Sequence, residues 1–269
     1  MTAERPGSRL EAAFRKGQPA LVVYLMAGYP DREASLRALH TVADAGADVI
    51  ELGVPYGDPL ADGPVIAEAA RVARSVPGGF GLAETIEMAS EFVEARRETG
   101  PPLVLMTYLN PLMRLGLSES ASRMRGAGVA GVIVPDMPVE AARPWLGEAH
   151  GLDTVFLAAP TSTDDRIRAV CEASAGFVYC VSSLGVTGER DRLSDAARAL
   201  VERVKAQTSL PAAVGFGISS AEQAAEAAAF ADGVIVGSAV VRRQQDPDAL
   251  AALVAELAEA VHGAERSAS

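Results

Sequence analysis

The sequence predicts an α/β protein that folds as a single (β/α)8 (TIM) barrel. The chain has 269 residues, close to the roughly 250 of a complete barrel of this kind. Short β-branched runs alternate with Ala-rich segments of helical period from end to end, as repeated βα units require. With 49% hydrophobic residues, the chain can bury a sizeable core.

Eight short runs rich in Val, Ile and Leu are the expected strands. They are apolar along their whole length, which is typical of parallel strands covered on both faces. An open, doubly wound sheet is the alternative, but evenly spaced units favour closure into a barrel. The runs occupy residues 21–27, 48–52, 102–107, 131–135, 154–159, 176–181, 211–216 and 233–237.

Amphipathic helices are expected between these runs. Leu, Val and Ala recur at i, i+3 and i+4, so each helix has one apolar face to lay on the sheet. No Pro/Ser-rich linker interrupts the series, and we expect one domain over residues 1–269, with about 1–12 and 263–269 poorly ordered. The clearest helices are expected at 32–46, 83–98, 139–150, 194–207 and 248–262.

The charge of the chain excludes some functions. A formal charge of −11 and a pI near 4.8 oppose binding to a polyanion, so no nucleic-acid partner is expected. The first twenty residues are studded with charges, and no run approaches the ~18 apolar residues of a membrane span. We therefore expect no signal peptide and no membrane association, and a cytoplasmic location.

The cysteines and histidines suggest no metal or redox site. Cys171 and Cys180 do not form a C-x-x-C pair and are interpreted as buried structural thiols. His40, His150 and His262 all fall in amphipathic segments without a metal-binding or nucleophile motif around them. Structural roles are the better interpretation for all five residues.

Glu51 ends an apolar strand in the stretch IELGVPYGDPLADGP (50–64). Alternation along the strand puts it on one face with Val49, and either face of a barrel strand is enclosed. A buried carboxylate must be paired, protonated or functional. A structural ion pair is one interpretation, but the C-terminal end of a barrel strand is where active sites are built, which favours function.

Two further carboxylates follow in the same loop. Asp62 stands just before Gly63-Pro64 and could either cap the helix expected from about Ile66 or point into the barrel mouth. Asp58 precedes a proline, which is typical of a turn former. We assign Asp58 to the shape of the loop or to a partner surface.

Glycine-rich segments follow the last three expected strands, at 185–190, 215–220 and 237–243. Gly217 and Gly237 allow close backbone approach, and Ser238 begins a short expected helix. Because phosphate sites after strands seven and eight recur in this fold, the sequence predicts a phosphate site at the C-terminal mouth. The long polar segment 182–195 is either a lid or an inert surface loop.

Several motifs together resemble the α subunit of tryptophan synthase, the indole-3-glycerol phosphate lyase family. The resemblance runs over nearly the whole chain, and the order and spacing of its motifs are specific. They are ELGVPYGDPLADGP (51–64), LMTYLNPLMRLG (105–116), GVIVPDMPVEAA (131–142), GVTGER (185–190), GFGIS (215–219) and VGSAVV (236–241). The family is a (β/α)8 barrel, which agrees with the eight units.

The resemblance implies roles for individual residues. Glu51 resembles the acid/base residue, Asp62 the carboxylate that holds the indole N–H, and Tyr179 the active-site tyrosine. Thr187 resembles the lid threonine that contacts Asp62. The implied phosphate contacts are Gly188, Gly217, Gly237 and Ser238, and the implied indole pocket and lid comprise Tyr24, Met106, Tyr108, Ile133, Thr187 and Phe216.

The implied activity is aldol-type cleavage of indole-3-glycerol phosphate to indole and glyceraldehyde 3-phosphate. No metal or cofactor is expected in this chain, because pyridoxal phosphate would be carried by a β subunit in an α2β2 complex that receives the indole. Breaking the bond at indole C3 requires a proton at C3 and removal of one from the adjacent hydroxyl. One carboxyl group can do both.

The chain departs from the family at Gly57, where Ser or Thr is usual between the aromatic residue and Asp58. Since this loop is expected near the β subunit, the departure bears on coupling to the partner. A stand-alone lyase that releases free indole is therefore the alternative. A non-catalytic activator of a β subunit is less favoured, because a scaffold does not need Glu51 and Asp62, and a phosphate-binding isomerase rests on fold analogy alone.

Overall fold

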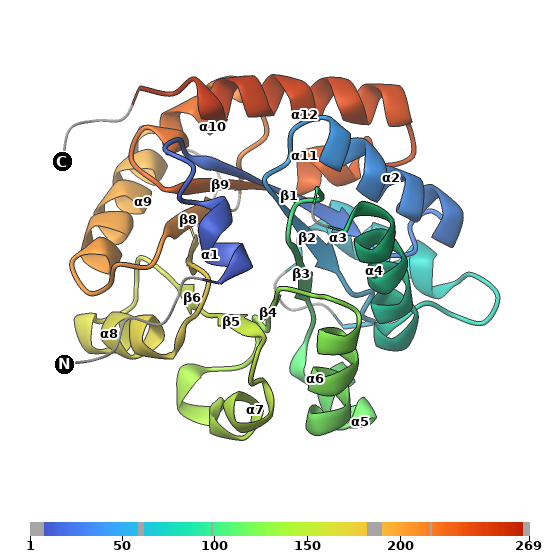
Figure 1. The fold of residues 1–269 in the computed structure, drawn as a ribbon. Coiled ribbons are helices and arrows are strands. Elements are labelled where there is room, and N and C mark those ends of the chain that lie inside the picture. The colour runs from blue at the N-terminus through green and yellow to red at the C-terminus, as the bar shows by residue number, and fades with distance from the viewer. Residues whose placement is uncertain (1–7, 59–61, 98, 182–189, 216, 266–269) are drawn as a thin grey trace.

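The strands form one parallel sheet that closes into a barrel. The computed structural model describes residues 8–58, 62–97, 99–181, 190–215 and 217–265. Nine strands pair in the order β5-β4-β3-β2-β1-β9-β8-β7-β6, all in parallel. Figure 1 shows the strands arranged as a ring.

Each of the eight expected strands is present, and the predicted (β/α)8 barrel is confirmed. The fifth expected strand, 154–159, is divided at Phe156 into β5 and β6, which stand at the two ends of the sheet order and so complete the ring. The strands are β1 (Ala20–Met26), β2 (Val49–Gly53), β3 (Leu103–Met106), β4 (Gly131–Ile133), β5 (Asp153–Val155), β6 (Leu157–Ala158), β7 (Val178–Val181), β8 (Ala212–Gly215) and β9 (Gly233–Val236).

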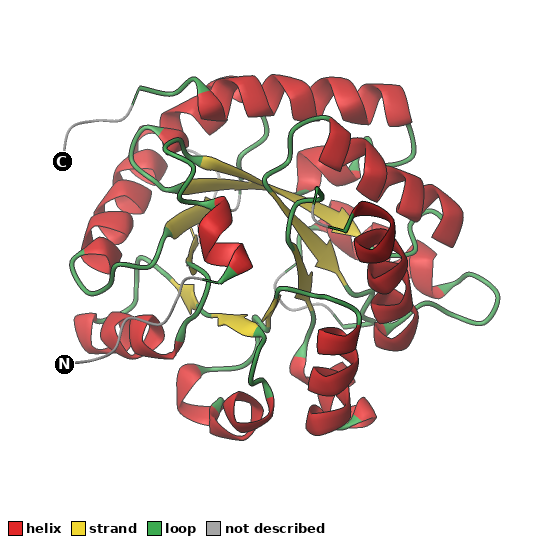
Figure 2. Cartoon of the chain, viewed as in Figure 1, coloured by secondary structure: helices red, strands yellow, loops and turns green. Residues whose placement is uncertain are grey.

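Helices surround the strands (Figure 2). The single helix expected at 139–150 is instead a 3-10 turn, η1 (Val139–Ala141), and a separate helix in which Pro144 occupies the first turn. The α-helices are α1 (Arg9–Ala13), α2 (Arg32–Asp44), α3 (Pro64–Arg74), α4 (Leu82–Arg96), α5 (Leu109–Leu115), α6 (Leu117–Gly126), α7 (Arg143–Glu148), α8 (Asp164–Ala173), α9 (Arg190–Lys205), α10 (Ala221–Ala228), α11 (Ser238–Val241) and α12 (Pro247–His262).

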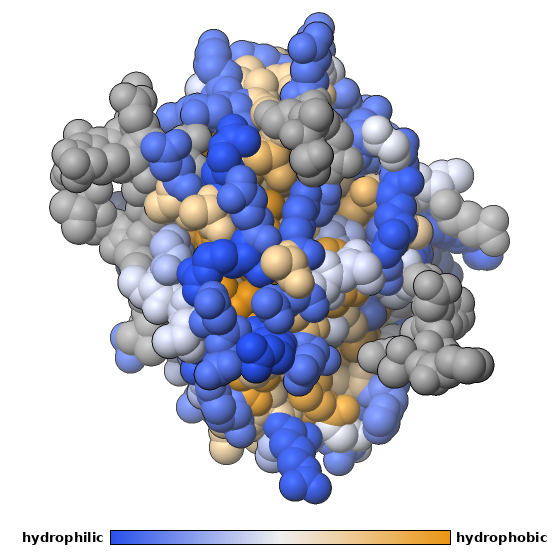
Figure 3. All heavy atoms as spheres, turned by 90° about the vertical axis from the view of Figure 1, so that its left-hand side faces the viewer, coloured by the Kyte–Doolittle hydropathy of each residue, from blue (hydrophilic) through white to orange (hydrophobic). Residues whose placement is uncertain are grey.

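Side-chain alternation along the strands produces two apolar layers. Leu21, Val23 and Leu25 of β1 face outward and pack with the helices, whereas Val22 packs inside the ring with residues such as Val49 of β2. This is the alternation expected of barrel strands. The helices expose polar residues to solvent. On the face shown in Figure 3, hydrophilic residues predominate and hydrophobic residues are visible between them.

Helix α1 covers the N-terminal end of the barrel, where Leu10 and Phe14 meet glycines at or near the starts of strands, and it lies inside the ring, left of its centre, in Figure 1. Leu10 and Phe14 are almost fully buried, and the Phe14 ring lies 5.0 Å from that of Phe177, between ring centroids. The Ser8 hydroxyl, just before α1, donates to the carboxylate of Asp153, the first residue of β5. This helix overlaps the end of the segment, about residues 1–12, for which the sequence predicted poor order.

Candidate active site

Glu51 points into the barrel at its C-terminal end. Its neighbour on the same face, Val49, belongs to the inner apolar cluster, whereas Ile50 and Leu52 pack outward against the helices. Only 1% of Glu51 is exposed. Strand alternation therefore aims the carboxyl group at the mouth, whereas the sequence alone left open which face of the strand carries it.

The Glu51 carboxyl group is not engaged in a structural ion pair with any described residue. Its buried Oε2 atom has no hydrogen-bond partner within the described part of the chain. Burial, and then the negative charge of Asp62, raise the pKa of Glu51 to about 8. The group is accordingly protonated at neutral pH, because a buried carboxylate without a cation favours its neutral form.

Asp62 belongs to the mouth rather than to a helix cap. Helix α3 begins one residue later than a cap at Asp62 would require, with Gly63 as its N-cap and no side-chain cap bond. Burial raises the pKa of Asp62 to about 6, and a hydrogen bond from Tyr108 opposes that rise. Asp62 is therefore largely ionised at pH 7, while Glu51 is largely protonated.

Two buried tyrosines line the same space. Tyr24 of β1 is the register partner of Glu51 on β2, and Tyr179 of β7 packs in the inner cluster. Burial raises the pKa of both hydroxyls, and negative charge raises it further: Asp62 and Glu51 act on Tyr24, and Glu51 acts on Tyr179. Both hydroxyls therefore stay neutral at physiological pH.

Glycines on the neighbouring strands make room for these tyrosine hydroxyls. A Cβ atom at Gly53 would collide with the Tyr24 hydroxyl, and one at Gly215 would collide with the Tyr179 hydroxyl. Both glycines end strands on the inner face, so the missing side chains open the mouth. The sequence analysis did not single them out, because only the fold shows which hydroxyl occupies each space.

Aromatic and aliphatic side chains complete one wall. Tyr56 stacks on Tyr108 with ring centroids 4.9 Å apart and an interplanar angle of 27°. Ile133 is buried in the inner cluster, and the partly buried Met106 joins that cluster to the one around Tyr24. The structure thus brings together Tyr24, Met106, Tyr108 and Ile133, all of which were predicted for the indole pocket. Tyr56 also belongs to this wall, although the sequence analysis did not single it out.

The predicted phosphate residues lie at neighbouring strand ends. Gly217 has φ +83° and open space where a Cβ would be, a conformation that favours glycine. A Cβ at Gly237 would lie 3.7 Å from Tyr24 Cβ and 3.6 Å from Ile66 Cδ1, and Ser238 begins α11 immediately after it. The other predicted contacts, Gly188, Thr187 and Phe216, lie outside the described residues.

Gly57 has a distinct neighbour. A Cβ there would meet the guanidinium of Arg74, from the last turn of α3. Where the resemblance led us to expect Ser or Thr, the tip of an arginine side chain lies beside the glycine. The contact is on the exposed rim and does not involve the buried carboxyl groups.

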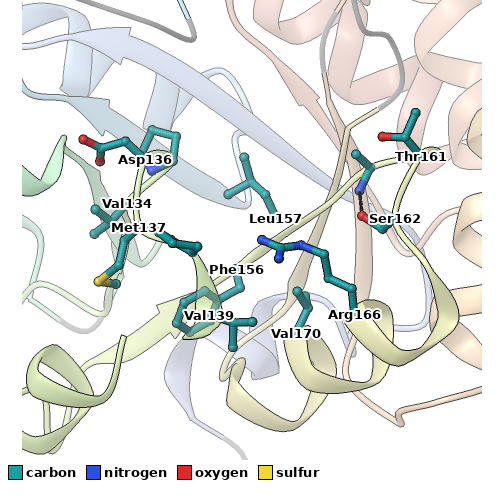
Figure 4. A pocket seen from close by; sticks show the side chains of 13 residues that line it. Val134, Asp136, Met137, Val139, Phe156, Leu157, Thr161, Ser162, Arg166 and Val170 are labelled. Carbon is teal, nitrogen blue, oxygen red and sulfur yellow. Dashed lines mark hydrogen bonds between the residues drawn. The ribbon is translucent and has the colours of Figure 1, made fainter. Parts of the chain in front are cut away.

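A cavity of about 450 Å³ lies beside the mouth, between the segment after β4 and helix α8. Its walls include Val134, Met137 and Phe156, and Arg166 extends into it from α8 (Figure 4). Arg166 is ion-paired with Glu140, with 2.6 Å between the guanidinium and carboxylate atoms. Among the described residues, none of those predicted for the active site lines this cavity, so we do not place the reaction there.

The cysteines and the partnered histidines lie away from the mouth. Cys171 and Cys180 are free and buried. His40 accepts a hydrogen bond from Arg96 between helices α2 and α4, and His262 lies 2.7 Å from Asp48, which precedes β2. Within the described part of the chain, no group of three or more His, Cys, Asp or Glu residues could hold a metal ion.

Fold and site together define a class: a (β/α)8 barrel with a protonated and an ionised carboxyl group, walled by tyrosines, at its C-terminal mouth. The family model described as "Tryptophan synthase alpha chain" matches residues 10–268. The chain belongs to this family, which confirms the resemblance found in the sequence. None of the described helices is long and apolar enough to cross a bilayer.

Similar proteins cover almost the whole chain. The tryptophan synthase alpha chain of Streptomyces avermitilis is 44% identical over 263 residues, 94% of this chain and 93% of the relative. That of Mycobacterium bovis BCG is 45% identical over 96% and 95%. A structure of Mycobacterium tuberculosis tryptophan synthase has a TM-score of 0.87 at 42% identity, covering 96% of this chain and 99% of that chain. Subunit alpha from Legionella pneumophila has a TM-score of 0.86 at 32% identity, covering 96% and 100%.

Proposed function

We propose that this chain cleaves indole-3-glycerol phosphate to indole and glyceraldehyde 3-phosphate, as a carbon–carbon lyase. The observation that carries the proposal is the Glu51 carboxyl group, which is buried, unpartnered among the described residues and raised in pKa to about 8 beside Asp62. A neutral acid next to a carboxylate is the pair that this reaction requires.

Glu51 acts first as an acid. It donates its proton to indole C3, and the ring nitrogen becomes positively charged. Asp62, with a pKa of about 6, is ionised and accepts the N1–H hydrogen bond, so it stabilises that positive charge as it develops. Glu51 acts as the acid and Asp62 as the carboxylate because their different environments give them different pKa values.

Glu51 then acts as a base. The Glu51 carboxylate removes the proton of the hydroxyl on the carbon attached to C3. The carbon–carbon bond breaks, its electrons return to the ring, and the hydroxyl carbon becomes the aldehyde. Glu51 ends protonated, so the cycle consumes no net proton, and this chain needs no cofactor for the step.

We assign the substrate's two ends to the residues described above. Tyr24, Met106, Tyr108 and Ile133 border the indole, and Tyr179 donates its neutral hydroxyl near Glu51. Gly217, Gly237 and Ser238 bind the phosphate through backbone and hydroxyl groups, together with Gly188. Thr187 and Phe216 complete the lid and the pocket in this proposal.

The chain is proposed to pass indole to a β subunit, which would carry pyridoxal phosphate, within an α2β2 complex in the cytoplasm. Solved structures similar to this chain are of tryptophan synthase, which supports this partner. The alternative, a stand-alone indole-releasing lyase, is favoured by one feature: at Gly57, where the resemblance leads us to expect Ser or Thr, the Arg74 guanidinium lies where a side chain would be.

Indole release from indole-3-glycerol phosphate tests the proposal. The purified chain is assayed alone and with a tryptophan synthase β subunit, with Glu51→Gln as the inactive control. Weak release that rises manyfold with the β subunit supports the coupled enzyme. Brisk release without a response to the β subunit supports the stand-alone lyase, and no release in either case overturns both.

A further inference from the structure

Strand β1 extends beyond its neighbour β9 at the mouth of the barrel. The last residues paired between them are Val23 and Val236, but β1 continues to Met26. The chain of β9 turns away at Gly237 into α11. The final residues of β1 therefore have an edge with no strand beside it.

The backbone groups of Met26 face this edge. In a strand, the N–H groups of successive residues point to opposite sides. The N–H of Ala27 donates to Gly53 on the β2 side, so the N–H of Met26 points to the side that β9 has left. Buried backbone groups of this kind need partners, since an unpaired one costs about as much as a lost hydrogen bond.

The side chain of Gln244 supplies both partners. Its Oε1 atom accepts the Met26 N–H at 3.0 Å, and its Nε2 atom donates to the Met26 carbonyl at 2.7 Å and to the Tyr29 carbonyl at 2.9 Å. Gln244 is 2% exposed. One carboxamide thus imitates the peptide group of a missing strand, and the Met26 N–H fixes its orientation because that group can only donate.

Gln244 follows α11, and α11 packs on the structures that carry the site. Val241 of α11 shares an apolar cluster with Tyr24 and Met26 of β1 and with Ala69 and Ala70 of α3. Gly237, just before α11, lies against Tyr24 and the first turn of α3. The three elements form one packed unit, and α3 begins two residues after Asp62.

We propose that Gln244 is a positioning residue for the cleavage reaction. By hydrogen-bonding the unpaired, buried edge of β1, Gln244 allows the backbone to leave the sheet at Gly237. It also fixes the position of that turn relative to Tyr24 and the start of α3. The inference rests on the proposed function in one respect, the assignment of Gly237 and Ser238 to the substrate phosphate.

The test uses Gln244→Met, which keeps roughly the length and volume of the side chain but removes both the Oε1 acceptor and the Nε2 donor of the amide. Gln245→Met is the matched control, because Gln245 is exposed and bonds only the Tyr29 hydroxyl among the contacts described here. Full-length variants are assayed in the complex with a β subunit. The measurements are KM and kcat for indole-3-glycerol phosphate, inhibition by glycerol 3-phosphate, and indole binding.

We expect Gln244→Met to raise KM and the glycerol 3-phosphate inhibition constant by about tenfold or more, since small misplacements of binding groups have effects of this size. Indole binding should change less, and Gln245→Met should behave as wild type. A merely structural role would lower the melting temperature and leave KM unchanged. A folded Gln244→Met variant with KM and inhibition constant within twofold of wild type overturns the inference.

If Gln244→Met does not fold, Gln244→Glu replaces it. The carboxylate keeps the acceptor for Met26 but faces two carbonyl oxygens to which it cannot donate, so the same rise in the inhibition constant is expected, and its absence overturns the inference. Failure of the chemical assignment is separate: an active Glu51→Gln variant would refute the acid/base role without altering glycerol 3-phosphate inhibition. If glycerol 3-phosphate does not inhibit the wild type, the phosphate site and this inference both fail.

Discussion

Tyr24 and Glu51 are register partners on adjacent strands, and both point into the mouth of the barrel. The tyrosine hydroxyl fills the space above Gly53, which follows Glu51 on the same inner face two residues later. The carboxyl group is thereby shut away from bulk water, which is the main cause of its raised pKa. Predictions for both residues follow from this arrangement.

Glu51→Gln should lose on the order of 10²–10⁴ in turnover, because the amide has nearly the same shape but cannot transfer a proton. Single-turnover release of indole from indole-3-glycerol phosphate measures the loss. Substrate affinity should be largely retained. Turnover near that of the wild type would refute the acid/base role.

The same substitution should change how stability depends on pH. The folded-state pKa of Glu51 is raised from 4.5 to about 8, so its contribution to stability is present below pH ~4.5 and lost as pH rises through 8. Gln does not titrate. The melting temperature of Glu51→Gln relative to wild type should therefore increase between pH 5 and pH 9, and a constant difference would contradict the raised pKa.

Asp62→Asn should bind substrate but turn it over poorly, because the charge that stabilises the positively charged ring is gone. It should also move the alkaline limb of the pH–rate profile to lower pH. Asp62 is the second cause of the raised pKa of Glu51, after burial, so neutralising it lowers that pKa. The residual activity of the variant, measured from pH 5 to 10, checks this; an unmoved limb would mean that Glu51 does not set it.

Gly53→Ala should destabilise the fold by about 1–3 kcal/mol and impair cleavage, because the new methyl group must displace the buried Tyr24 ring. Gly126→Ala is the control: it lies in helix α6 with no atom within 4 Å of a new Cβ, and should be stabilising by about 0.5–1 kcal/mol. Urea denaturation compares the two, and equal effects would contradict the close fit at Gly53.

Gly57→Ser should leave stability within about 0.5 kcal/mol of wild type, because the exposed Arg74 side chain can swing aside. A residue with a side chain restricts the loop, so activation by a β subunit should increase. Rates with and without the β subunit give the ratio. Arg74→Ala separates the two causes: if it raises the ratio equally, the displaced arginine is responsible rather than the stiffer loop.

Local pattern was sufficient to predict the strands and the main helices. Runs such as 48–52 and 233–237 are apolar, short and bounded by Gly or polar residues, and they form β2 and β9 with shifts of one residue. The strand period also placed Glu51 on the same face as Val49, and the barrel fold implied that this face is enclosed. The helix expected at 139–150 was wrong because Pro144 starts a new helix instead of continuing the old one.

Features that depend on distant contacts could not be predicted. The choice between cap and mouth for Asp62 required the true start of α3. The roles of Gly53 and Gly215 depend on which tyrosine hydroxyl reaches them. Gln244 lies 218 residues from Met26, and no periodicity in the sequence links an amide side chain to the unpaired edge of a strand.

Helix α1 has a consequence for the order in which the protein is built. Leu10 and Phe14 occupy the spaces left by Gly131, Gly176 and Gly233, the last of which begins the final strand. Helix α1 therefore has no complete binding site until β9, more than 200 residues further along the chain, has been synthesised. Contacts of such long sequence separation slow folding. The packing of α1 onto the N-terminal end of the barrel therefore belongs to the last stage of folding.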